Sequence, residues 1–136
     1  MGVWTIATDR IQIGKEVDDI LIKEFIIFSD ISCPKSYCRE KFCNLWFFDE
    51  KNRLICHAGK FAEPEVWYEH LKEYFFAPYR HFLPDEIHYL GECEEGFERI
   101  ARRRSEEYQV WKQRMEHMDV DTIYNTKYNL NRSIYV

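Results

Sequence analysis

The stretch NLWFFDEKNRLICH, residues 44–57, decides the fold that the sequence predicts. Two short runs rich in aromatic and β-branched residues flank the polar residues DEKN, and Asp and Asn readily bond to their own backbone in turns. We therefore expect a β-hairpin. Strand alternation places Phe47 on one face and Trp46 and Phe48 on the other. Because both faces are apolar, the hairpin should be covered on both sides.

A short helix and another strand are predicted downstream of the hairpin. Pro64 suits the first turn of a helix, where its missing N–H is not needed, and Pro78 should end that helix. Apolar residues between the two prolines follow helical spacing, with acidic residues on the opposite side. The run over residues 86–90 then favours a strand that ends at Gly91. This order predicts one helix, about 64–76, packed on an antiparallel sheet.

Residues 95–118 form the clearest predicted helix. Its apolar side chains recur at alternating spacings of three and four residues. At about 1.5 Å per residue the helix spans roughly 35 Å, which is long for so small a domain. We therefore expect its distal half to leave the sheet and to contact a protein partner or a second copy of the chain. The candidate partner-binding residues are Arg104, Tyr108, Trp111 and Met115.

The basic run at residues 102–104 is balanced by acids on the same helix. Glu98, Glu106 and Glu107 surround it, so we interpret it as charge balance on a helix surface rather than as a phosphate or RNA site. Arg104 itself falls within the apolar stripe. Either its stem lies along the core, or its guanidinium meets a buried acid or a partner carboxylate.

The residue pattern predicts secondary structure less clearly in the N-terminal part of the chain. Residues 3–6 and 11–13 look like two short strands around a turn. Residues 17–28 fit a helical stripe, but their isoleucines favour a strand, and we expect a strand over 23–28. Residues 29–42 are polar, contain a proline and three cysteines, and indicate a loop.

Together these elements predict an α+β fold in one domain, residues 1–119, followed by a polar, Tyr- and Asn-rich tail, residues 120–136. An antiparallel sheet of about 4–6 strands would be packed by the helices at 64–76 and 95–118. A content of 46% hydrophobic and 17% aromatic residues is sufficient for a real core and excludes a wholly disordered chain.

Charge and hydropathy exclude several kinds of partner. The net charge of −5, from 19 basic and 24 acidic residues, makes nucleic acid an unlikely partner, because nucleic-acid-binding surfaces are basic. The N-terminus lacks the basic start of a signal peptide, and no apolar run approaches the roughly 20 residues of a membrane span. We therefore expect a cytoplasmic protein with reduced cysteines and no membrane partner.

One cysteine cluster has partial resemblance to a metal site. Cys33, Cys38 and Cys43 are separated by four residues each, and Cys56 or His57 could complete a four-ligand zinc site. The usual spacing of two residues between paired thiols is absent, so free thiols are the favoured interpretation. We otherwise expect no cofactor.

Catalytic motifs are scarce. Glu86 and His88 share one face of a predicted strand and are weak candidates for acid–base catalysis. Cys56 and His57 are strand neighbours that point to opposite faces, so they cannot form a catalytic pair. The sequence contains no glycine-rich phosphate loop, no Gly-x-Ser-x-Gly elbow and no His-Glu-x-x-His helix.

The leading hypothesis is a non-catalytic protein-binding domain, either a homodimer or a domain with a separate protein partner. Its size and acidity suit a stoichiometric inhibitor of a basic partner, of the immunity or antitoxin kind. The first alternative is a small enzyme or ligand-binding domain with its site between sheet and helix, near Glu86, His88 and Tyr89. The second alternative is a zinc-stabilised adaptor.

Overall fold

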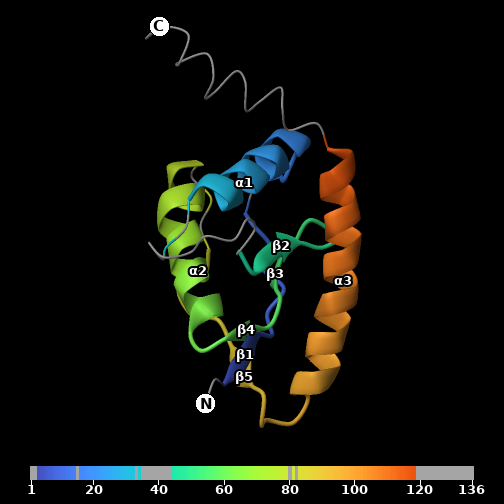
Figure 1. Cartoon of the computed structure of the whole chain (residues 1–136). Helices are drawn as coiled ribbons and strands as arrows, with labels where there is room; N and C mark the ends of the chain where they lie inside the picture. The colour runs from blue at the N-terminus through green and yellow to red at the C-terminus, as the bar shows by residue number, and fades with distance from the viewer. Residues whose placement is uncertain are drawn as a thin grey trace, which may run out of the picture.

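The computed structural model describes residues 3–14, 16–32, 34, 44–79, 81 and 83–118. Within this part of the chain, helices surround two small antiparallel sheets (Figure 1). Helices α2 and α3 flank the strands on opposite sides, and α1 crosses one end of the molecule. The predicted mixture of helices with antiparallel strands is confirmed. The strands do not form one sheet of 4–6 members, however, but a sheet of three and a sheet of two.

The predicted hairpin is the two-stranded sheet. β2 (Trp46–Phe48) pairs with β3 (Leu54–Cys56) in antiparallel register. The turn between them depends on Asp49, whose Oδ1 accepts hydrogen bonds from the backbone N–H groups of Lys51 (3.0 Å) and Arg53 (2.9 Å). Every residue of both strands is buried, which confirms that the hairpin is covered on both sides.

The other sheet has the order β4-β1-β5, with both pairs antiparallel. β1 is Trp4–Ala7, β4 is Gly59–Lys60 and β5 is Tyr89–Gly91. Residues 11–13 do not form the expected strand, because only Ile11 makes a single bridge, to Leu54. The predicted strand at 86–90 is also shorter than expected.

Residues Asp19–Ile31 form helix α1, so the expected strand over 23–28 is wrong. Asp18 caps the helix by accepting a hydrogen bond from the backbone N–H of Leu21 at 2.8 Å. Phe25 lies at the centre of the buried face, and its ring is 4.9 Å from that of Phe48. Strand propensity is weak and context-dependent, and here the cap and the wide apolar face of the helix outweigh it.

Helix α2 (Glu63–Leu71) continues through a π-helical turn, Lys72–Phe76, and a 3₁₀ turn, Ala77–Tyr79. The predicted helix over 64–76 is therefore confirmed, with Pro64 in its first turn. The Pro64 carbonyl accepts a hydrogen bond from Trp46 Nε1 at 2.9 Å, which ties the start of α2 to β2.

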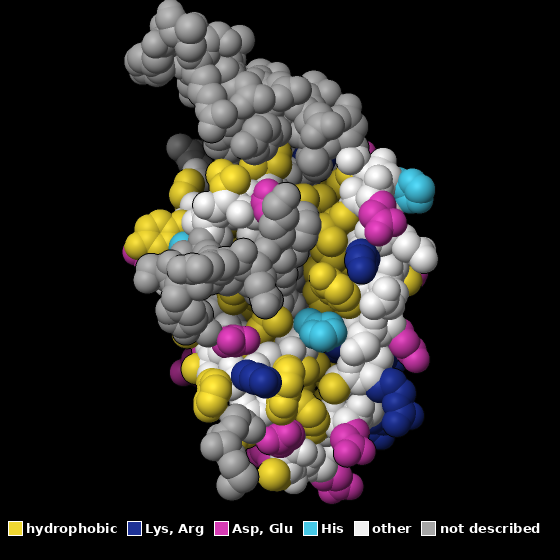
Figure 2. Space-filling model, viewed as in Figure 1, with side chains coloured by type: hydrophobic (Ala, Val, Ile, Leu, Met, Phe, Trp, Pro, Cys, Tyr) yellow, Lys and Arg dark blue, Asp and Glu magenta, His cyan; other side chains and the backbone are white. Residues whose placement is uncertain are grey.

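Helix α3 (Phe97–His117) confirms the long C-terminal helix. Its distal half does not leave the fold, which corrects the expectation from its length. Trp111 is only 4% exposed, and its ring lies 6.1 Å from Phe25 of α1 and 5.9 Å from Phe48 of β2. Because α1 is a helix rather than a strand, it fills the space beside this half of α3. Hydrophobic side chains gather along the inner side of α3 (Figure 2).

Some predictions fall on residues that are not described. The polar tail at 120–136 lies wholly outside the described residues, and the loop at 29–42 lies mostly outside them. In the described part of the chain, none of the helices combines the length and the apolar character needed to cross a membrane.

Candidate functional site

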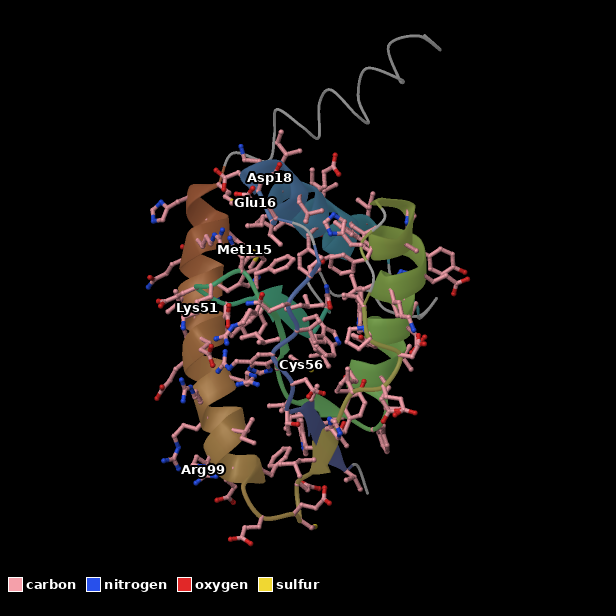
Figure 3. All side chains as sticks on the ribbon, turned by 180° about the vertical axis from the view of Figure 1, so that it is seen from behind. Glu16, Asp18, Lys51, Cys56, Arg99 and Met115 are labelled. Atoms are coloured by element: carbon pink, nitrogen blue, oxygen red, sulfur yellow. The ribbon has the colours of Figure 1, made fainter. Side chains whose placement is uncertain are left out.

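The predicted cysteine site can be examined only at its proposed fourth ligand, Cys56 or His57. Cys33, Cys38 and Cys43 lie outside the described residues. Cys56 is fully buried between the elements of the core (Figure 3), and burial raises the pKa of its thiol to about 12. Its Sγ donates a hydrogen bond to the His57 carbonyl at 2.9 Å. A thiol held protonated in this way is a poor nucleophile and a poor metal ligand. Across the residues that the structure describes, no three His, Cys, Asp or Glu side chains are placed to hold a metal ion.

The partner-binding candidates of α3 face inward. Trp111 belongs to the core, and Tyr108 is half-buried with its ring 5.4 Å from Phe47 and 5.2 Å from His57. Met115 is also half-buried and packs against the core (Figure 3). The apolar stripe that suggested an interface is thus the packing face of the helix, and Trp111 has almost no surface left for a partner.

Arg104 is 3% exposed, and its guanidinium meets a partly buried acid, which is one of the two predicted explanations. Arg104 Nη2 donates to the Thr8 carbonyl at 3.2 Å, and Nη1 lies 3.5 Å from Glu107 Oε1. Burial, followed by the neighbouring Arg10, lowers the pKa of Arg104 from its usual value. Glu107 offsets part of this effect.

Arg104 and Glu107 are part of an ion-pair cluster with Arg10, Asp49 and Arg53. Arg10 bonds to both oxygens of Glu107 at 2.7 and 2.6 Å, and its Nη1 also lies 2.9 Å from Asp49 Oδ2. Arg53 Nε donates to the same oxygen of Asp49 at 2.9 Å. The cluster therefore joins the segment after β1, the hairpin turn and α3.

The ion-pair cluster, apart from Arg104, lines a groove of about 330 Å³ between the hairpin turn and α3, beside Lys51 (Figure 3). Burial alone would raise the pKa of the Asp49 carboxyl, but the Arg53 N–H and the charges of Arg53 and Arg10 hold it below its usual value. The pKa of Glu107 is likewise lowered, because Arg10 and Arg104 outweigh the effect of burial. Both carboxylates of the cluster are paired with guanidinium groups, so we interpret the cluster as a structural clamp.

A second groove, of about 380 Å³, lies between α2 and the segment that precedes and begins β5. We call it the acidic groove. Its lining residues are Glu65, Tyr68, Glu69, Asp85, Glu86, Ile87, His88 and Tyr89. Asp85 pairs with Lys72. The other three carboxylates, of Glu65, Glu69 and Glu86, form no ion pair with any described residue.

Two tyrosines form the walls of the acidic groove. The Tyr68 hydroxyl donates to the Pro84 carbonyl at 2.5 Å. Burial, reinforced by the charges of Glu69 and Asp85, raises the pKa of Tyr68, and burial with Glu65 raises that of Tyr89. Both phenols therefore stay neutral. Tyr68 is almost fully buried, whereas the half-buried Tyr89 presents aromatic surface beside carboxylates that have no ion pair with a described residue. Such a combination favours cationic side chains.

Glu86 and His88 both line the acidic groove, although they precede β5 and do not lie on it. The His88 side chain is exposed, with Nδ1 3.3 Å from Asp9 Oδ1, while its backbone N–H donates to Asp9 Oδ2 at 2.6 Å. The sequence thus located one wall of the groove. It did not indicate Glu65 and Glu69, which look like ordinary polar positions on a surface helix.

Comparison with known proteins yields one partial likeness. No protein-family model matches the chain, and no solved structure matches it. A stretch of 60 residues is 35% identical to AP-1 complex subunit gamma-1 of Arabidopsis thaliana. This stretch covers 42% of the chain but only 7% of that protein, so the likeness is restricted to a small part of it.

Proposed function

We propose that this chain is a non-catalytic protein-binding domain that receives a basic segment of a protein partner in the acidic groove. The observation that carries the proposal is the set of three carboxylates, of Glu65, Glu69 and Glu86, which form no ion pair with a described residue and lie in one groove with Tyr89. Arginine or lysine side chains of a partner would pair with these carboxylates and stack on the half-buried Tyr89.

Electrostatics supports this choice of partner. Glu65 and Glu69 are four residues apart on α2, and like charges at that spacing destabilise a helix by roughly 0.2–0.5 kcal/mol. A cation bound between the two glutamates removes this repulsion, so binding of the partner also stabilises the helix.

The net charge of −5 also steers a basic partner toward the domain. A stoichiometric inhibitor that masks a basic active site, of the immunity or antitoxin kind, would bind in this way. The partial likeness to a subunit of a protein complex agrees with a binding role.

The proposal is tested with a fluorescein-labelled nona-arginine peptide, measured by fluorescence anisotropy at low and moderate salt. The triple variant Glu65→Gln, Glu69→Gln, Glu86→Gln should bind at least about tenfold more weakly than the wild type. Its melting temperature should be equal or higher, because the repulsion along α2 is removed.

The matched control is Glu98→Gln, Glu106→Gln, Glu116→Gln, which removes the same charge from exposed positions of α3. It should retain most of the affinity. Equal losses in the two triple variants would show that net charge alone attracts the peptide, and the proposal would then be wrong. No measurable binding by the wild type would overturn it as well.

A further inference from the structure

Strand β5 lies at an edge of the three-stranded sheet, because the order β4-β1-β5 gives it a neighbour on one side only. Directly after β1, the Thr8 N–H donates to the His88 carbonyl at 2.9 Å, and the Glu92 N–H donates to a β1 carbonyl at 2.9 Å. Backbone groups of an antiparallel strand point alternately toward and away from the paired strand. The even-numbered residues from 88 to 92 therefore face β1, and the odd-numbered residues from 87 to 91 face away from it.

The outward side of β5 is closed at Gly91 and open at Ile87 and Tyr89. Glu94 Oε2 accepts a hydrogen bond from the Gly91 N–H at 2.5 Å, and the Glu94 N–H donates to the Gly91 carbonyl at 3.0 Å. The backbone N–H and C=O groups of Ile87 and Tyr89 form no hydrogen bond with any residue that the structure describes. We call these four groups the open edge. Such an edge is a template for pairing with another extended chain.

The open edge lies at the acidic groove, since Ile87 and Tyr89 both line it. The sheet register also shows which face of the sheet α2 covers. A Cβ at Gly59 would lie 3.2 Å from Cδ of Pro64 in α2, and Gly59 is aligned through β1 with Gly91. Tyr89, two residues from Gly91, points to this same face. A chain that pairs with the open edge would therefore direct every second side chain toward α2.

Antiparallel pairing fixes which residues of an added strand meet α2, and both existing pairs of this sheet are antiparallel. A residue opposite Tyr89 would exchange both backbone hydrogen bonds with it and would share its face of the sheet. The residues that donate to the open edge are therefore the same residues whose side chains point toward α2. Because Glu65 and Glu69 line the groove on that helix without an ion pair to a described residue, cationic side chains suit these positions.

The spacing of the two glutamates also suits an extended chain. With a rise of about 1.5 Å per residue, Glu65 and Glu69 are about 6 Å apart along α2. Alternate residues of an antiparallel strand are about 6.8 Å apart. Two cationic side chains at alternate positions of a strand can thus each pair with one glutamate. A helical segment would bond its own backbone groups to one another and leave the open edge unpaired.

We infer that the basic segment of the partner binds in an extended conformation and adds an antiparallel strand to the open edge of β5. Its arginines or lysines occupy alternate positions, where they donate backbone N–H groups to Ile87 and Tyr89 and direct their side chains toward Glu65 and Glu69. This inference rests on the proposed function and adds the conformation and direction of the bound segment. In strand addition, main-chain hydrogen bonds give affinity and alternate side chains give specificity.

Three fluorescein-labelled peptides of equal charge test the inference on the wild-type protein by fluorescence anisotropy. The parent is Arg-Val-Arg-Val-Arg-Val-Arg, and two derivatives carry backbone N-methyl groups on either the last three arginines or the three valines. The arginine-methylated peptide should bind at least about tenfold more weakly than the parent, because its arginines cannot donate to the open edge. The valine-methylated peptide is the matched control and should keep most of the affinity, since its lost donors face away from β5.

Amide hydrogen exchange, measured by NMR on the labelled protein, locates the added strand. Binding of the parent peptide should slow exchange of the Ile87 and Tyr89 N–H groups at least about tenfold, because both become hydrogen-bonded. The His88 N–H, which already donates to Asp9 Oδ2, and the Leu90 N–H, which faces β1, should change much less. The arginine-methylated peptide should not give this selective protection.

The outcomes separate the inference from the proposed function. Equal affinities for the two methylated peptides, or a loss confined to the valine-methylated peptide, would overturn the inference and leave the proposed function in place. The same holds if nona-arginine binds and the parent peptide does not. If neither peptide binds, or both bind the groove triple variant as tightly as the wild type, the proposed function fails instead.

A second copy of the chain is the remaining occupant that the test can reveal. A dimer in sedimentation velocity, with the Ile87 and Tyr89 amides protected before any peptide is added, would show that β5 pairs with another copy. That result would also overturn the inference.

Discussion

Replacing Trp111 by alanine is expected to lower the free energy of unfolding by about 3–5 kcal/mol, a typical cost for removing a large buried aromatic side chain. Trp111 is 4% exposed and contacts the rings of Phe25, Phe47 and Phe48 at 6.1, 6.4 and 5.9 Å. Small domains are stable by about 5–15 kcal/mol in total. The variant should therefore be close to unfolding at room temperature, which urea titration followed by circular dichroism would measure.

Val110→Ala is the matched control, because Val110 precedes Trp111 on α3 but is exposed. It should change stability by less than about 1 kcal/mol. A Trp111→Ala variant that keeps wild-type stability but loses self-association would show that Trp111 contacts another chain. That result would restore the interpretation suggested by the length of the helix.

Local pattern is sufficient to predict the hairpin and the two later helices, because each of them carries its own signals. The hairpin has an Asp-containing turn between two apolar runs, and Asp49 accepts the turn bonds as expected. α2 has a proline in its first turn, and α3 has a long stripe at helical spacing. In each case propensity, pattern and turn chemistry agree.

Local pattern fails where residues far apart in the chain decide the outcome. α1 contains isoleucines that favour a strand, yet Phe25 packs against Phe48, Phe75 and Trp111 only if the segment is a helix. The inward direction of Trp111 follows from the same packing. No spacing in the sequence could have revealed that α1 is a helix or that Trp111 points inward.

The residues that line the two grooves are likewise predictable only in part from local sequence pattern. Glu86 and His88 are recognisable as a pair of polar residues at alternate positions, so one wall of the acidic groove is predictable. Its other wall, with Glu65 and Glu69, depends on where α2 packs. Arg10 and Glu107 of the ion-pair cluster are 97 residues apart, so only the folded chain shows their contact.

The second large effect is expected at Asp49, where Asp49→Ala should destabilise the fold by about 2–4 kcal/mol at neutral pH. The carboxylate accepts four hydrogen bonds, from the backbone N–H groups of Lys51 and Arg53 and from the side chains of Arg10 and Arg53. Alanine leaves all four donors without this acceptor. Asp49→Asn should cost less, because the amide oxygen can still accept the two turn bonds.

The stabilisation by Asp49 should also depend on pH in a definite direction. The pKa of Asp49 is lower in the folded protein than in an unfolded chain, so the unfolded state binds its proton first as the pH falls. Its contribution is therefore fully present above the unfolded pKa, near 4, and is lost as the pH falls through the folded value. Glu107, whose pKa is also lowered, should add to the acid sensitivity.

Urea titrations at pH 7, 5 and 3 would measure this effect as the difference in unfolding free energy between the wild type and Asp49→Asn. The difference should be nearly constant from pH 7 to 5 and should shrink at pH 3. Asp85→Asn provides the contrast, since Lys72 also lowers the pKa of Asp85, but this pair is on the surface and should contribute little at any pH. An Asp49 difference that stays the same at pH 3 would show that the ion pairs with Arg10 and Arg53 add nothing to the turn bonds. The clamp between the N-terminal segment, the hairpin and α3 would then depend on Glu107 alone.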